Sequence, residues 1–99
     1  GGDEATKERL LKIIPLGSEV SKLEAEAEIR QWRLRRDDRI FPKGESHYLA
    51  EDCEHQGGVR RGVVIAEYGL LTTSVETSWL FDEKGKLASL CIRRTTDAP

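Results

Sequence analysis

The C-terminal third of the sequence contains a β-hairpin, and this feature constrains the fold more than any other. Thr72–Phe81 is rich in Thr, Val, Trp and Phe, which are residues that strands favour. Asp82–Gly85 has the composition of a type I turn closed by a glycine bulge, and Lys86–Arg94 follows as the return strand. The sequence therefore predicts an antiparallel sheet at this end of the chain.

Two registers are open for this hairpin. A type I turn with a glycine bulge would set Phe81 beside Leu87 and Thr77 beside Cys91. A four-residue loop would shift every pair by one residue. The turn chemistry favours the first register, and a one-residue slip would exchange the side chains on the two faces of the sheet.

The first third of the chain has helical spacing instead. Apolar residues cluster within Leu10–Ile14, and Pro15 ends this short helix because the residue before a proline is pushed out of the α region. A second helix begins at Ser18 or at Ser21, either of which can cap it, and runs through Trp32. Its apolar residues are spaced three, four and seven apart, which places one wide face against a core.

The middle of the chain changes from helical to strand character. The polar, unpatterned run Arg35–Arg39 predicts a loop, and Ser46–Ala50 predicts a short strand. Glu51–Gly58 predicts a long exposed loop. Val59–Tyr68 then predicts a strand, which is followed by a turn or bulge at Gly69.

These elements define an α+β fold in two layers, with two N-terminal helices packed on a three- to four-stranded antiparallel sheet. The 99 residues suit one domain, which we expect over residues 3–96. Gly1 and Gly2 are predicted to be the scar of a cloning tag. The sequence holds no Met, which favours a processed or recloned chain, either one that has lost a signal peptide or lipoprotein leader or a domain cut from a longer protein.

The charge balance disfavours two classes of partner. Lys and Arg number 16 against 18 Asp and Glu, so the basic excess that suits nucleic acid or membrane surfaces is absent. No apolar run approaches the roughly 18–20 residues that span a bilayer. Arginines do cluster along the chain, but acids lie close to them in sequence, which predicts a mixed, solvated surface.

The cysteines and histidines allow two interpretations. Cys53 and Cys91 either form a disulfide, which would require an oxidising compartment and contribute about 4 kcal/mol by the chain-entropy argument, or remain unpaired thiols. Together with His47 and His55 they have the composition of a zinc ligand set. Their spacing argues against zinc, because no C-x-x-C or H-x-x-x-H pair exists.

No residue set in the sequence converges on catalysis, so we predict no enzyme, no cofactor and no metal. Glu76 is the one acid with a half-buried expected position, and a solvent-facing strand residue is its simpler interpretation. The stretch Trp79, Leu80 and Phe81 places an apolar side chain on each face of its strand. The face away from the helices would then be an apolar interaction surface, unless Ile40–Pro42 covers it.

Two segments resemble a known family. Ile13–Ser18, between the helices, is similar to the hydrophobic-x-x-Gly-Thr/Ser linker of small bacterial envelope lipoproteins of the SmpA/OmlA type. Trp79–Leu87 resembles the hairpin with which that family ends, and domains like the β-lactamase inhibitor protein share the plan. The long second helix departs from the family, whose helix ends near a Gly-x-Pro. The resemblance implies a non-catalytic envelope module that contacts other proteins.

Three functional hypotheses follow. The leading one is an exported, lipid-anchored interaction or scaffolding module of the periplasm or cell envelope, with another envelope protein as partner and membrane contact only through the anchor. The second is a cystatin-like or nuclear-transport-factor-2-like domain, either a simple binding domain or an enzyme. It holds a small ligand in a pocket between helix and sheet lined by Trp32, His47 and Glu76. The third, an intracellular nucleic-acid accessory domain, requires the arginines to converge on one face.

Overall fold

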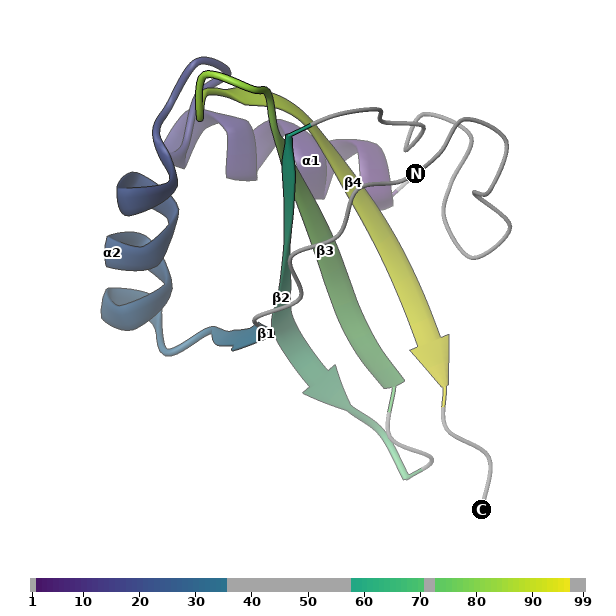
Figure 1. Ribbon diagram of the computed structural model, residues 1–99. Helices are drawn as coiled ribbons and strands as arrows, with labels where there is room; N and C mark the ends of the chain where they lie inside the picture. Colours follow the sequence, from purple (N-terminus) through teal and green to yellow (C-terminus); the bar gives the residue numbers. More distant parts are fainter. Residues whose placement is uncertain (1, 36–57, 71–72, 97–99) are drawn as a thin grey trace.

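The structure is a computed structural model of the chain, and it describes residues 2–35, 58–70 and 73–96. Two helices precede four strands, which confirms the predicted α+β class (Figure 1). The elements, in chain order, are α1 (Gly2–Ile13), α2 (Val20–Arg30), β1 (Arg33–Arg35), β2 (Val59–Tyr68), β3 (Thr73–Phe81) and β4 (Leu87–Thr96).

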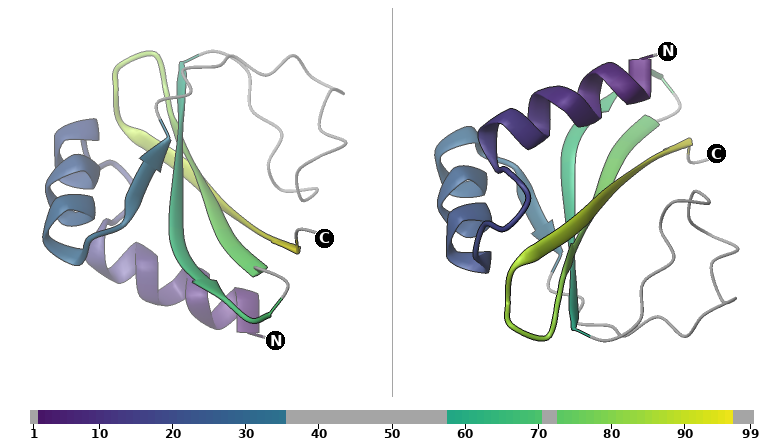
Figure 2. Two further views of the ribbon diagram at one scale, coloured as in Figure 1. Left: turned by 90° about the horizontal axis from the view of Figure 1, so that it is seen from below. Right: turned by 90° about the horizontal axis from the view of Figure 1, so that it is seen from above.

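The strands form one antiparallel sheet in the order β1-β2-β3-β4. Figure 2 shows α1 lying across one face of this sheet, while α2 lies beside the β1 edge. The helices and the sheet therefore make the two layers that the sequence predicts. None of the helices in the described ranges is long and apolar enough to cross a membrane.

The core lies between the helices and one face of the sheet, which we call the helix face. Strand alternation places every second side chain of β3 and β4 on this face, and the helices cover them with leucine and isoleucine side chains. Trp79 and Phe81 are the largest fully buried side chains. The main core cluster consists of Leu10, Ile14, Leu23, Val63, Trp79, Phe81, Leu87 and Leu90.

The β3–β4 turn has the predicted chemistry. The Gly85 N–H donates to the Asp82 carbonyl at 2.9 Å, the Asp82 N–H donates to the Lys86 carbonyl at 2.8 Å, and Gly85 has a φ of 78°. Beside this turn Phe81 pairs with Leu87, as the first of the two registers requires. The turn chemistry thus identified the correct register at the hairpin end.

Farther along the hairpin, the predicted pair of Thr77 and Cys91 is wrong. A β-bulge opposite Leu80 and Phe81 inserts one residue, Ala88, into β4, so Thr77 pairs with Ile92 instead. Both side chains of that pair then face the core side, and Cys91 is moved to the other face of the sheet.

Asp82 gives this turn a pH dependence. The backbone N–H groups of Lys86 and Lys84 donate to its Oδ1 at 3.0 and 2.9 Å, and these bonds hold the pKa of Asp82 below its ordinary value of 3.8. Because the folded pKa is depressed, the carboxylate stabilises the fold above the ordinary pKa and loses that contribution as the pH falls toward the folded pKa.

We therefore expect Asp82→Asn, which keeps an acceptor oxygen but does not titrate, to flatten the fall in Tm between about pH 5 and pH 2. Thermal melts followed by circular dichroism measure this slope. Glu83→Gln is the matched control, since it removes a carboxylate from the same turn without touching these bonds. If Tm falls with pH as steeply in Asp82→Asn as in the wild type, the Asp82 carboxylate does not contribute to the loss of stability in acid.

Neither predicted cap residue starts the second helix. The N-cap is Glu19, which makes no side-chain capping bond, and α2 begins at Val20. A tertiary contact fixes where α2 starts, because Glu19 forms an isolated β-bridge with Lys86. The Glu19 carboxylate also forms an ion pair with the Lys86 Nζ at 2.8 Å. This ion pair also lowers the pKa of Glu19, chiefly through the hydrogen bond from Lys86.

The second helix ends earlier than predicted, and a strand was missed. Gln31 adopts a left-handed conformation with φ of 59°, which ends α2 at Arg30. Arg33–Arg35 then pairs with β2 as β1, where the sequence analysis continued the helix to Trp32 and placed a loop from Arg35. The predicted elements at Ser46–Ala50, Ile40–Pro42 and 51–57 lie outside the described residues.

Candidate functional site

The face of the sheet opposite the helices carries several charged side chains beside buried apolar ones, and we call it the polar face. One cross-strand row crosses all four strands as Arg33, Val64, Glu76 and Arg93. Arg93 contacts Glu76 at 2.7 Å, and the Glu76 side chain is only 16% exposed. Glu76 is thus half-buried and held in an ion pair with the neighbouring strand.

Further contacts on this face involve the predicted arginine clusters. Arg33 contacts Glu67 at 2.7 Å on the neighbouring strand, and the Arg60 Nε donates to the Ser78 hydroxyl at 3.1 Å. The acids that pair with Arg33 and Arg93 come from neighbouring strands rather than from neighbouring sequence, so strand pairing creates the mixed charge of this surface.

The structure does not bring together the predicted ligand pocket. Trp32 packs against the core cluster on the helix face, whereas Glu76 projects from the polar face, because it pairs with Val64 and Arg93 in strand register. The sheet therefore separates the two side chains. His47, the third predicted lining residue, lies outside the described residues.

The predicted interaction surface at Trp79, Leu80 and Phe81 is also wrong, because all three side chains are fully buried. Trp79 and Phe81 belong to the helix-face core. Leu80 lies on the opposite side of the sheet, where it packs with Cys91. The alternation along β3 correctly predicted that Leu80 and its two neighbours lie on opposite faces of the sheet. Both faces are buried at these positions, so none of the three side chains is available at the surface.

Cys91 lies in β4, is 3% exposed, and is disulfide-bonded. Cys53, the predicted partner, lies outside the described residues, so the Cys53–Cys91 pairing stays a prediction. Within the described ranges no three His, Cys, Asp or Glu side chains gather to hold a metal ion.

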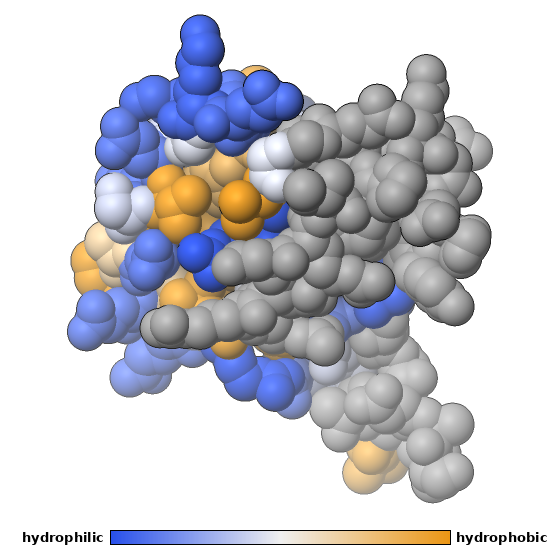
Figure 3. All heavy atoms as spheres, in the orientation of Figure 1, coloured by the Kyte–Doolittle hydropathy of each residue, from blue (hydrophilic) through white to orange (hydrophobic). Residues whose placement is uncertain are grey.

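Exposed apolar side chains occur instead at the end of β2. Tyr68 is 54% exposed and Leu70 is fully exposed, and the Arg94 guanidinium donates to the Tyr68 hydroxyl at 3.3 Å. Figure 3 shows hydrophobic residues at the tip of this β2–β3 hairpin, apart from those near α2. Ile29, in the last turn of α2, is also 74% exposed. The sequence analysis missed this tip, although Leu70 directly follows the predicted turn at Gly69.

A shallow recess lies beside β2, between the end of α2 and the sheet. It has a volume of about 240 Å³. Gln31 from the helix cap and Arg33 from β1 line one side, and residues of β2 line the other. The β2 contribution consists of Val64, Ile65, Ala66 and Glu67. No sequence motif marks this recess, because it exists only where β2 continues past the first residue of the short β1.

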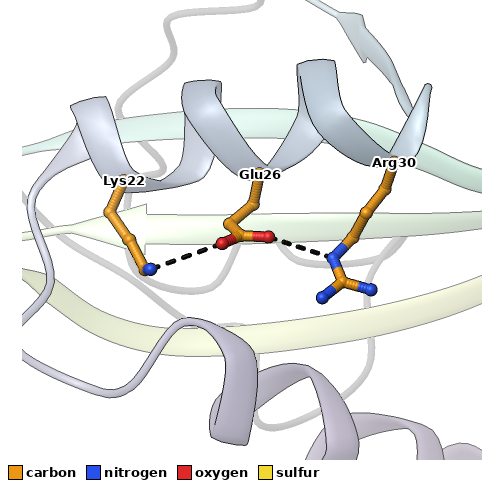
Figure 4. A network of polar contacts seen from close by, with 3 residues as sticks. All are labelled: Lys22, Glu26 and Arg30. Atoms are coloured by element: carbon orange, nitrogen blue, oxygen red, sulfur yellow. Dashed lines mark hydrogen bonds and ion pairs between the residues drawn. The ribbon is translucent and has the colours of Figure 1, made fainter.

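The polar side of α2 near this recess is held by an ion-pair chain. Glu26 lies between Lys22 and Arg30, at 3.3 and 3.0 Å, with each partner one helical turn away (Figure 4). The hydrogen bond from Arg30 is the main cause that lowers the pKa of Glu26. Arg30 also lies 5.8 Å from the Trp32 ring, so it bridges the helix to the segment leading into β1.

Comparisons with known proteins identify no relative: no family model, no curated protein and no solved structure matches this chain.

Proposed function

We propose that the protein is a non-catalytic interaction module of the bacterial cell envelope, where it binds another envelope protein. The exposed apolar tip of the β2–β3 hairpin carries this proposal. The hairpin end that carries Tyr68 and Leu70 extends beyond the part of the sheet that the helices cover (Figure 1), and a contiguous apolar patch left exposed marks a protein contact site. The disulfide state of Cys91 suits an oxidising compartment such as the periplasm.

Crosslinking from the hairpin tip tests the interaction. A photoreactive benzoylphenylalanine replaces Leu70, and the exported protein is irradiated in cells of its own organism. We expect one discrete adduct with an envelope protein, and loss of that adduct when the partner's gene is deleted. Glu83, exposed in the β3–β4 turn at the other end of the sheet, is the matched control position and should give none.

Equal adducts from both positions, an adduct only with intracellular proteins, or no adduct at all would each contradict the proposal. The compartment is checked in the same cells by mass after thiol alkylation. Cys91 should resist alkylation until a reductant is added, because a disulfide sulfur has no thiol to react. Labelling without reductant would argue against an oxidising compartment.

A further inference from the structure

β2 has an edge that β1 does not cover. β1 pairs only with Gly62, Val63 and Val64, whereas β3 pairs with β2 on the other side as far as Tyr68, with a bulge at Ile65. Within the described ranges no strand pairs with the outer edge of Ile65–Tyr68. A strand edge of this kind presents backbone N–H and C=O groups that can pair with another extended chain.

The end of α2 explains why this edge is open. The left-handed Gln31 turns the chain, and Trp32 then packs against the core, so that the chain reaches the edge of β2 only at Arg33. An added strand would lie in line with β1 and continue it along Ile65–Tyr68. The space it would enter is the recess that Gln31, Arg33 and the β2 residues line.

The size of the recess favours an extended chain over a small ligand. Its volume of about 240 Å³ lies below the roughly 300–1,000 Å³ of sites that enclose a small molecule. A strand needs no enclosed cavity, because main-chain hydrogen bonds supply affinity and only alternate side chains need space.

Arg33 sets the charge that suits this edge. Its side chain is 65% exposed, and its guanidinium contacts Glu67 through one nitrogen at 2.7 Å. A guanidinium has five N–H donors, so a second carboxylate can bind without displacing Glu67. The exposed Arg33–Glu67 pair shields the edge only weakly, since ion pairs of this kind contribute little to stability.

We propose that an extended segment of a protein partner adds as a strand beside Ile65–Tyr68 and places an acidic side chain on Arg33. This inference rests on the proposed function and specifies how the partner binds. The partner is a protein with an acidic residue in an extended, otherwise β-prone stretch.

The experiment uses a defined probe, the acetylated and amidated hexapeptide TVEVTV, titrated into the ¹⁵N-labelled protein. We expect saturable amide shifts at Ile65–Tyr68 and at Arg33. The matched peptide TVKVTV should bind roughly fivefold more weakly, because it replaces an attractive ion pair by a repulsive one. Two further versions of TVEVTV carry methyl groups on alternate backbone nitrogens, one version for each of the two alternating sets. One of the two should give no amide shifts, because its methylated nitrogens are those that would donate hydrogen bonds to the strand edge.

Arg33→Gln should remove the preference for TVEVTV over TVKVTV. Lys84→Gln is the matched control, because it removes the same charge from the exposed β3–β4 turn and should keep the preference. Both side chains are exposed, and a spectrum that is unchanged away from the substituted residue shows that each variant is folded.

Three results would overturn the inference: no shifts at millimolar TVEVTV, shifts confined to another edge such as β4, or shifts of Ile65–Tyr68 that follow protein concentration without peptide. The last result would assign the edge to a second copy of this chain. An adduct from the Leu70 position together with no peptide shifts would leave the proposed function standing and remove the strand addition. Peptide shifts without an adduct from the Leu70 position would support strand addition at this edge and contradict the proposed function.

Discussion

Trp79→Ala is expected to lower the free energy of unfolding by about 3–5 kcal/mol, the largest effect of any single substitution considered for this protein. Trp79 is fully buried in the main core cluster, which both helices and three of the strands form. Truncation removes the largest side chain of that cluster and leaves a cavity that the backbone of the sheet cannot close. A domain of this size has a total stability of about 5–15 kcal/mol, so the variant would be marginal.

Part of this effect belongs to a buried hydrogen-bond chain. The Trp79 Nε1–H donates to the Thr77 hydroxyl at 2.8 Å, and that hydroxyl donates to the Val63 carbonyl at 2.8 Å. Urea denaturation followed by circular dichroism separates the contributions. Thr77→Val keeps the volume but leaves the indole N–H and the carbonyl without this partner, and should cost about 1–3 kcal/mol. A loss below about 1 kcal/mol in Trp79→Ala would show that the core is not organised around this residue.

Gly58→Ala is expected to be the second most destabilising substitution, at roughly 2–5 kcal/mol from backbone strain and overlap together. Gly58 has a φ of 75°, which an L side chain rarely adopts. A Cβ at this position would also lie 1.9 Å from the Phe81 carbonyl oxygen. That oxygen belongs to the β3 backbone, which cannot move aside without breaking the pairing of Val59 with Phe81.

Gly85→Ala separates the two causes. Gly85 has nearly the same φ, 78°, but a Cβ there meets nothing within 4 Å. It should therefore report the backbone strain alone, about 1 kcal/mol. If urea denaturation gives equal losses for both variants, the close approach of Gly58 to β3 does not limit the stability of the fold.

The sequence analysis predicted the elements whose signals are local. The turn at Asp82–Gly85 carries its own hydrogen-bonding side chain and its own glycine, so both the turn and the adjacent pair of Phe81 and Leu87 could be predicted. The bulge at Ala88 has no comparable signal, and it shifted the predicted pairing of Thr77 by one residue.

Where tertiary contacts decide, the sequence patterns were insufficient. The start of α2 follows from the bridge between Glu19 and Lys86, not from a nearby serine. Trp32–Arg35 alternates apolar and polar residues in the manner of a strand, but four residues beside a strong helical pattern were too few to predict β1. The recess depends on where β1 begins, so it could not be predicted either.

The connector between the two helices is hydrogen-bonded to the start of the last strand. The Gly17 N–H donates to the Leu87 carbonyl at 2.8 Å, and the Leu87 N–H donates to the Ser18 carbonyl at 2.7 Å. Residues made early in synthesis thus depend on residues made near its end. The helices cannot dock while the ribosome is still producing β3, whereas the β2–β3–β4 hairpins can form among themselves as they emerge. Folding of this protein is therefore completed only after β4 has been made, and an unfinished chain keeps its helices undocked.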